Sequence, residues 1–194
     1  MGSWERSEFA ERDFKAMKLH GFVPGKATDI KFPGDEVIPA PEPGWRVAFS
    51  AFFFRGLSFP IHEFFRGLLF IYGVQLHDLT PNAILHIACF ITLCECFLGI
   101  EPHWGLWKRL YFVKRQASAD GVYPVGGFGI LVRSEVKFFA FKICESVQNW
   151  RKRWFYIRDS PAAGQENGLP PFNIGTEGRR KKHGRHTLSD EETP

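Results

Sequence analysis

The sequence lacks a Cys-x-x-Cys pair and has only four cysteines in 194 residues. Three of these fall close together, at Cys89, Cys94 and Cys96. Such clustering on one segment is not typical of a disulfide framework, which secreted domains of this size use. The N-terminal residues are charged and lack the apolar segment of a secretory signal. We therefore predict an intracellular protein in a reducing compartment.

Signatures of the familiar enzyme classes are also missing. The sequence has no Gly-rich P-loop, no G-x-S-x-G and no H-E-x-x-H motif. A metal-dependent nuclease would need carboxylates that converge on Mg²⁺ from separate elements. The candidates are Asp78, Asp120, Glu135 and Glu145, a set that any domain of this size can offer. We predict no catalytic residues and no cofactor, with a divergent transposase or nuclease as an alternative.

A structural zinc site is not predicted either, although histidines and cysteines gather between positions 77 and 103. His86 and Cys89 are three residues apart and share one helix face. Cys94 and Cys96 project about 200° apart on a helix, so they cannot bind one ion. Structural zinc requires four converging ligands. We interpret the cysteines as small apolar side chains of a core and predict no metal.

Apolar and aromatic residues are abundant enough for a sizeable core. The chain is 44% hydrophobic and 16% aromatic, with 21 phenylalanines. Its net charge of +4 is mild. That charge permits contact with nucleic acid but does not require it. No pattern indicates a small-molecule substrate.

The longest apolar run predicts a central helix over 81–98. Thr80 is a suitable N-cap, Pro81 suits the first helical position, and Gly99 is a natural end. Apolar side chains fall on every side, and Glu95 is the only formal charge. Such a helix is buried in a core or lies in a membrane. Because a carboxylate within lipid is costly, we predict a core helix and no membrane contact.

Periodicity elsewhere predicts an α+β fold, mainly helical around the 81–98 helix, with one small antiparallel sheet. Helices are expected over 3–19, capped by Ser3, over 61–72 and over 102–115, with a helical turn in 147–153. Strands are expected over 45–54, 128–133, 138–146 and 154–159. The predicted division is an N-terminal helix and linker (1–36), a main domain (37–159) and a disordered tail (160–194).

Two basic segments are candidates for nucleic-acid binding. In the first, cations alternate with the rings of Trp150, Trp154, Phe155 and Tyr156, and the alternation favours a strand that buries these rings. The second, in the tail, is typical of a nuclear localisation signal or a phosphate contact. The candidate residues are Arg151, Lys152, Arg153, Arg158, Arg179, Arg180, Lys181 and Lys182.

Several ordered blocks resemble a plant transposon-derived domain family, the gypsy-type transposases, over 37–159. The residues that carry the resemblance are Arg55, Gly56, Pro60, Pro81, Asn82, Glu95, Gly99, Trp107, Trp150 and Trp154. The resemblance implies an origin in a retrotransposon and supplies no catalytic residues. We therefore expect a non-catalytic structural or interaction module of a transposable element. Its expected partners are nucleic acid or a second copy, and binding through 150–158 and the tail is the first alternative.

Overall fold

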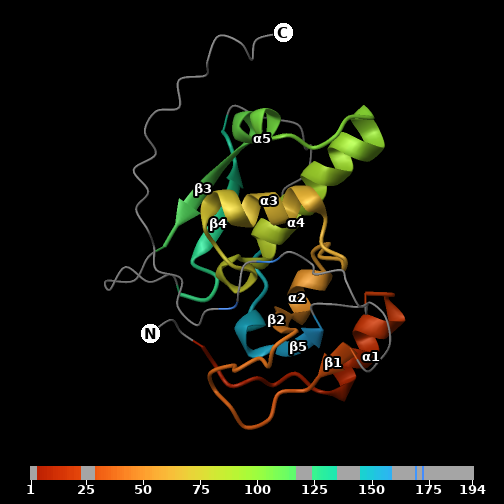
Figure 1. Ribbon diagram of the computed structural model, residues 1–194, viewed down its shortest axis with the longest axis vertical. Coiled ribbons are helices and arrows are strands. Elements are labelled where there is room, and N and C mark those ends of the chain that lie inside the picture. The colour runs from red at the N-terminus through yellow and green to blue at the C-terminus, as the bar shows by residue number, and fades with distance from the viewer. Residues whose placement is uncertain are drawn as a thin grey trace.

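The computed structural model describes residues 4–22, 29–116, 124–134, 145–158, 169 and 172. It has an α+β fold, as predicted, with two antiparallel sheets instead of one. One end of the molecule holds the three-stranded sheet with α1 and α2, and the other holds α3, α4, α5 and the pair β3–β4 (Figure 1).

The three-stranded sheet has the order β1-β5-β2, with β1 at Ile30–Lys31, β2 at Trp45–Phe49 and β5 at Trp154–Arg158. β5 lies in the middle and pairs antiparallel with both neighbours. The strand predicted over 154–159 is confirmed and ends one residue earlier, at Arg158.

The strand predicted over 45–54 is wrong after Phe49. The chain enters a short buried helix, α2 (Ser50–Phe53). Both parts are apolar at almost every position, and a short apolar run does not distinguish a strand from a buried helix. The backbone N–H of Ser50 donates to Arg153 O at 3.0 Å, which closes the β2–β5 ladder where the helix begins.

The helix predicted over 102–115 divides into two elements. α5 covers Trp104–Leu110, and the extended backbone of Tyr111 then begins β3 (Tyr111–Arg115). β3 pairs antiparallel with β4 (Phe128–Val132), which confirms the strand predicted there. The expected partner of β4 over 138–146 lies largely outside the described residues.

Helix α4 (Pro81–Thr92) begins as predicted, because the Thr80 hydroxyl accepts a hydrogen bond from Ala83 N at 3.1 Å. The helix continues as π-helical turns over Leu93–Leu98, and Gly99 ends it in the left-handed conformation. By length and mean hydropathy, 1.6, Pro81–Leu98 could also cross a membrane.

The prediction that this helix is buried on all sides is wrong. Only 39% of the Pro81–Leu98 segment is buried, and Phe97 is 78% exposed. The first three turns pack into the core, whereas the π-helical turns project from it (Figure 1). Glu95 has its partner there, since its Oε1 lies 2.9 Å from Nε2 of His62, the N-cap of α3 (Glu63–Tyr72).

The N-terminal helix is shorter than the predicted 3–19. α1 covers Glu11–Leu19 and is preceded by Ala10, whose N–H donates to Asp13 Oδ2 at 2.9 Å. Ser3, the expected cap, lies outside the described residues. Residues 4–9 instead run along the sheet, where Trp4 and Phe9 are buried. This segment therefore completes the core.

Candidate functional site

The cations predicted for nucleic-acid binding in 150–158 are held by contacts within the chain. Arg153 Nη1 lies 2.8 and 2.9 Å from the two carboxylate oxygens of Asp13. Lys152 Nζ lies 3.5 Å from Glu8 Oε1, and Arg158 Nε lies 3.3 Å from Asp29 Oδ1. These ion pairs neutralise three of the four charges in this segment.

The aromatic side chains of the same segment belong to the core, as the alternation predicted. Trp154 and Phe155 have no exposed surface, and Trp150 is almost fully buried. Trp154 Nε1 donates to Glu5 O at 2.8 Å, and the Tyr156 hydroxyl donates to Glu36 Oε1 at 2.9 Å. The rings thus hold the sheet to the N-terminal segment. The tail candidates, 179–182, lie outside the described residues.

A different set of cations has no acidic partner within the described ranges. We call it the basic hairpin; its residues lie on α5, on β3 and directly after β4, and they are Lys108, Arg109, Lys114, Arg115 and Arg133. The segments 102–116 and 124–134 contain no Asp or Glu. Among the described residues, none of the five forms an ion pair. The basic hairpin therefore concentrates uncompensated positive charge at one end of the molecule.

Aromatic side chains lie beside these cations. Lys108 Nζ lies 5.5 Å from the ring centre of Trp104, and the Arg115 guanidinium lies 5.7 Å from that of Phe128. Arg133 Nε donates to Lys108 O at 2.9 Å, which ties the end of β4 to α5. The sequence carried a signal that our prediction did not use, namely four cations without an acid between positions 104 and 116.

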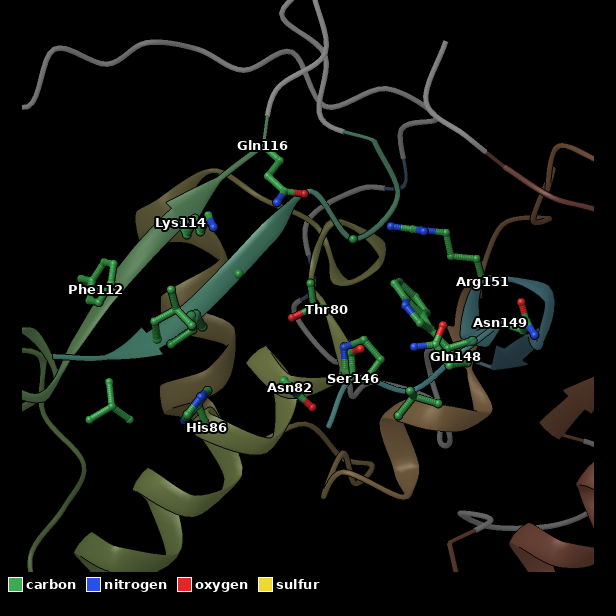
Figure 2. A pocket seen from close by; sticks show the side chains of 18 of the residues that line it. Thr80, Asn82, His86, Phe112, Lys114, Gln116, Ser146, Gln148, Asn149 and Arg151 are labelled. Atoms are coloured by element: carbon green, nitrogen blue, oxygen red, sulfur yellow. The ribbon is translucent and has the colours of Figure 1, made fainter. Parts of the chain in front are cut away.

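A cleft of about 1060 Å³ adjoins the basic hairpin (Figure 2). The β3–β4 pair forms one side, the start of α4 forms the floor, and residues 146–151 form the opposite side. Its labelled lining residues are Thr80, Asn82, His86, Phe112, Lys114, Gln116, Ser146, Gln148, Asn149 and Arg151. Arg151 Nε donates to Val125 O at 2.8 Å, which fixes this cation at the edge of the cleft.

The cleft brings together four of the residues singled out from the sequence: Pro81, Asn82, Trp150 and Arg151. The other family-motif residues have structural contacts elsewhere. Arg55 donates to Glu145 O at 3.1 Å, and the buried Trp107 Nε1 donates to Tyr72 OH at 2.9 Å.

His86 is the cleft residue that the sequence analysis missed as a binding candidate. Its side chain is 4% exposed, and its Nδ1 is buried without a hydrogen-bond partner. Burial lowers the pKa of this imidazole to about 4, so it is neutral at pH 7. A neutral imidazole can donate one hydrogen bond and accept another.

Stability is expected to fall as the pH drops below 6.5, the ordinary pKa of the His86 imidazole. The unfolded chain binds a proton at His86 in this range, whereas the folded chain does so only near pH 4. Because the unfolded state binds more protons, unfolding becomes easier as pH falls, by about 2 kcal/mol near pH 5 for this one group. Buried His77, whose pKa burial lowers to about 3, acts in the same direction.

Urea denaturation at neutral pH and near pH 5 measures this effect. His86→Phe should flatten the pH dependence of the free energy of unfolding, because the unfolded chain then has no imidazole at position 86 to protonate. An equal pH dependence in His86→Phe and the parent would contradict the assignment.

Two of the predicted carboxylates can be placed. Asp78 is fully buried, and its Oδ2 accepts a hydrogen bond from Gln75 N at 2.8 Å. Glu145 is exposed, whereas Asp120 and Glu135 lie outside the described residues. Within the described ranges, no group of three His, Cys, Asp or Glu side chains could hold a metal ion.

The resemblance noted in the sequence is confirmed for one segment, which supplies part of this site. Residues 47–115 match the family "Putative gypsy type transposon". This gypsy-type segment runs from β2 to the end of β3 and includes the floor of the cleft and the β3 strand of one side. No curated protein and no solved structure matches the chain.

Proposed function

We propose that this chain is a non-catalytic nucleic-acid-binding module of a transposable element, which contacts phosphates through the basic hairpin. The observation that carries the proposal is the contrast between two sets of cations. Those of 150–158 are largely neutralised by Asp13, Glu8 and Asp29, whereas those of the basic hairpin have no carboxylate partner among the described residues. Unpaired cations release counterions from nucleic acid when they meet phosphates.

The arrangement of the basic hairpin suits contact with the phosphate backbone of a nucleic acid. Lys114 and Arg115 are both exposed, and Lys108 and Arg109 are exposed on α5, the element directly before β3. The exposed Phe112 lies opposite Leu131 in the β3–β4 register, so apolar surface adjoins the charges. Cations next to an exposed ring are typical of surfaces that bind single strands.

A binding role is favoured over the nuclease alternative by the position of Asp78. Its carboxylate is buried and receives the N–H of Gln75, which fixes the turn before α4. A catalytic carboxylate that binds Mg²⁺ must face the substrate and solvent. Asp78 is instead placed to hold the start of α4 in position beneath the cleft.

The proposal is tested by fluorescence anisotropy with a labelled oligonucleotide over a range of salt concentrations. The triple variant K108A/R109A/K114A should weaken binding by about tenfold or more. The slope of log affinity against log salt should fall by about 2–3, because each lost phosphate contact removes about 0.7–0.9.

The matched control is R12A/K15A/K18A, which removes the same charge from α1 at the opposite end of the molecule (Figure 1). It should bind almost as tightly as the parent. Equal losses in both triple variants would indicate a non-specific charge effect and would overturn the proposal, as would absence of binding or insensitivity to salt.

A further inference from the structure

The floor of the cleft contains a buried polar atom that has no hydrogen-bond partner in the part of the chain that the structure describes. His86 Nδ1 has no hydrogen-bond partner, and the ring is held by an edge contact with Tyr111, with 5.5 Å between ring centres. A buried nitrogen left without a partner costs stability, so a fold that retains one calls for an explanation. His86 lines the cleft, so a ligand that enters it can supply the missing partner (Figure 2).

The other polar groups of the cleft are mostly neutral and can both donate and accept. Asn82 lies one helical turn before His86, and Gln116 and Gln148 line the same space from its two sides (Figure 2). A nucleobase edge presents donors and acceptors together, which amide and imidazole groups match. Glu5, the one carboxylate of the lining, lies 3.9 Å from Lys152. A phosphate at the floor would find no cation, since Lys114 and Arg151 lie on the sides.

The two sides of the cleft suit the sugar–phosphate backbone of the same ligand. Lys114 lies on β3 and Arg151 on the opposite side (Figure 2), where its guanidinium lies 5.3 Å from the ring centre of Trp150. Phe112 precedes Lys114 by two residues, so both project from the same face of β3. Its ring is 40% exposed and is available for stacking against a base.

From this arrangement we infer that the cleft takes one unpaired base of a single-stranded nucleic acid, and that His86 forms a hydrogen bond with the edge of that base. The inference rests on the proposed function and adds its ligand class. Bases of a duplex are paired and stacked, so they do not reach such a floor. The module therefore selects single strands, while the basic hairpin supplies the affinity for phosphates.

The test compares three labelled probes of equal length: a single-stranded oligonucleotide, the same strand with abasic sites at every position, and the corresponding duplex. The parent protein should bind the single strand at least about tenfold more tightly than either other probe, because only the single strand can place an unpaired base in the cleft and against Phe112. His86→Phe keeps the ring volume but removes both nitrogens. It should reduce this preference about threefold or more and leave the salt dependence unchanged.

His20→Phe is the control substitution and should retain the full preference. Circular dichroism and the unfolding midpoint establish that His86→Phe is folded, and the abasic comparison needs no variant at all. If the parent binds abasic and normal strands equally, the inference fails while the proposed function stands. If His86→Phe is folded and prefers the single strand as strongly as the parent does, the proposed hydrogen bond between His86 and the base is ruled out. If no probe binds, the proposed function itself fails.

Discussion

Replacing Trp154 with alanine is expected to lower the free energy of unfolding by about 3–5 kcal/mol, the range found for large aromatic residues in cores. Trp154 is fully buried in β5, contacts the rings of Trp4 and Tyr156, and donates its indole N–H to Glu5 O. Its loss would leave a cavity between the sheet and the N-terminal segment. Urea or thermal denaturation measures the change.

The matched control for Trp154 is Trp45, in the neighbouring strand of the same sheet. Trp45 is partly exposed and contacts the side chains of Lys31 and Arg158 at the surface. Trp45→Ala should therefore cost clearly less than Trp154→Ala. Similar losses at both positions would show that the burial of Trp154 contributes little.

Gly56→Ala is expected to destabilise the fold by about 2–5 kcal/mol. Gly56 has φ +93°, where a side chain is strained by about 1–2 kcal/mol. A methyl group there would also lie 2.7 Å from the Cβ of Ala88 on α4, and such overpacking typically costs about 1–3 kcal/mol. Thermal unfolding of the variant measures the sum of both effects.

A second substitution separates the two causes. Ala88→Gly alone should destabilise by about 1 kcal/mol, since glycine is unfavourable within a helix. In the Gly56→Ala background the same change removes the clash, so it should be neutral or stabilising. If Ala88→Gly costs the same in both backgrounds, the close approach of residue 56 to α4 is not the source of the strain.

The elements that the sequence predicted well have strong local signals. Thr80 and Pro81 start α4 and Gly99 ends its π-helical continuation, because capping chemistry depends only on neighbouring residues. β4 and β5 were predicted nearly to the residue, and the aromatic residues of β5 were expected in the core, where Trp154 and Phe155 lie.

The wrong predictions concern segments where local signals are ambiguous. The run 45–54 is apolar at almost every position, so the change from β2 to α2 at Ser50 leaves no mark on its periodicity. In 102–115 the helix α5 ends at Leu110 because Tyr111–Arg115 find a partner strand in β4. That pairing is tertiary and overrides helical propensity.

The candidate site could be predicted only in part, because charge compensation depends on residues distant in the sequence. Arg153 appeared available until the structure placed Asp13 beside it, 140 positions away. Four cations of the basic hairpin are close in the sequence, but only the structure shows that they lack an acidic partner among the described residues and that Arg133 joins them. The cleft itself joins residues 80–86, 112–116 and 146–151, and no local pattern connects these segments.

The central position of β5 has a consequence for the boundaries of the folding unit. The gypsy-type segment begins inside β2, yet β2 forms its ladder with β5, about forty residues after the segment ends. A fragment cut at 47–115 would lose Trp154 and Phe155 and uncover the buried Phe49, Phe52 and Phe53. The unit that folds is therefore longer than the unit that sequence similarity delimits, and it needs both the N-terminal segment and β5.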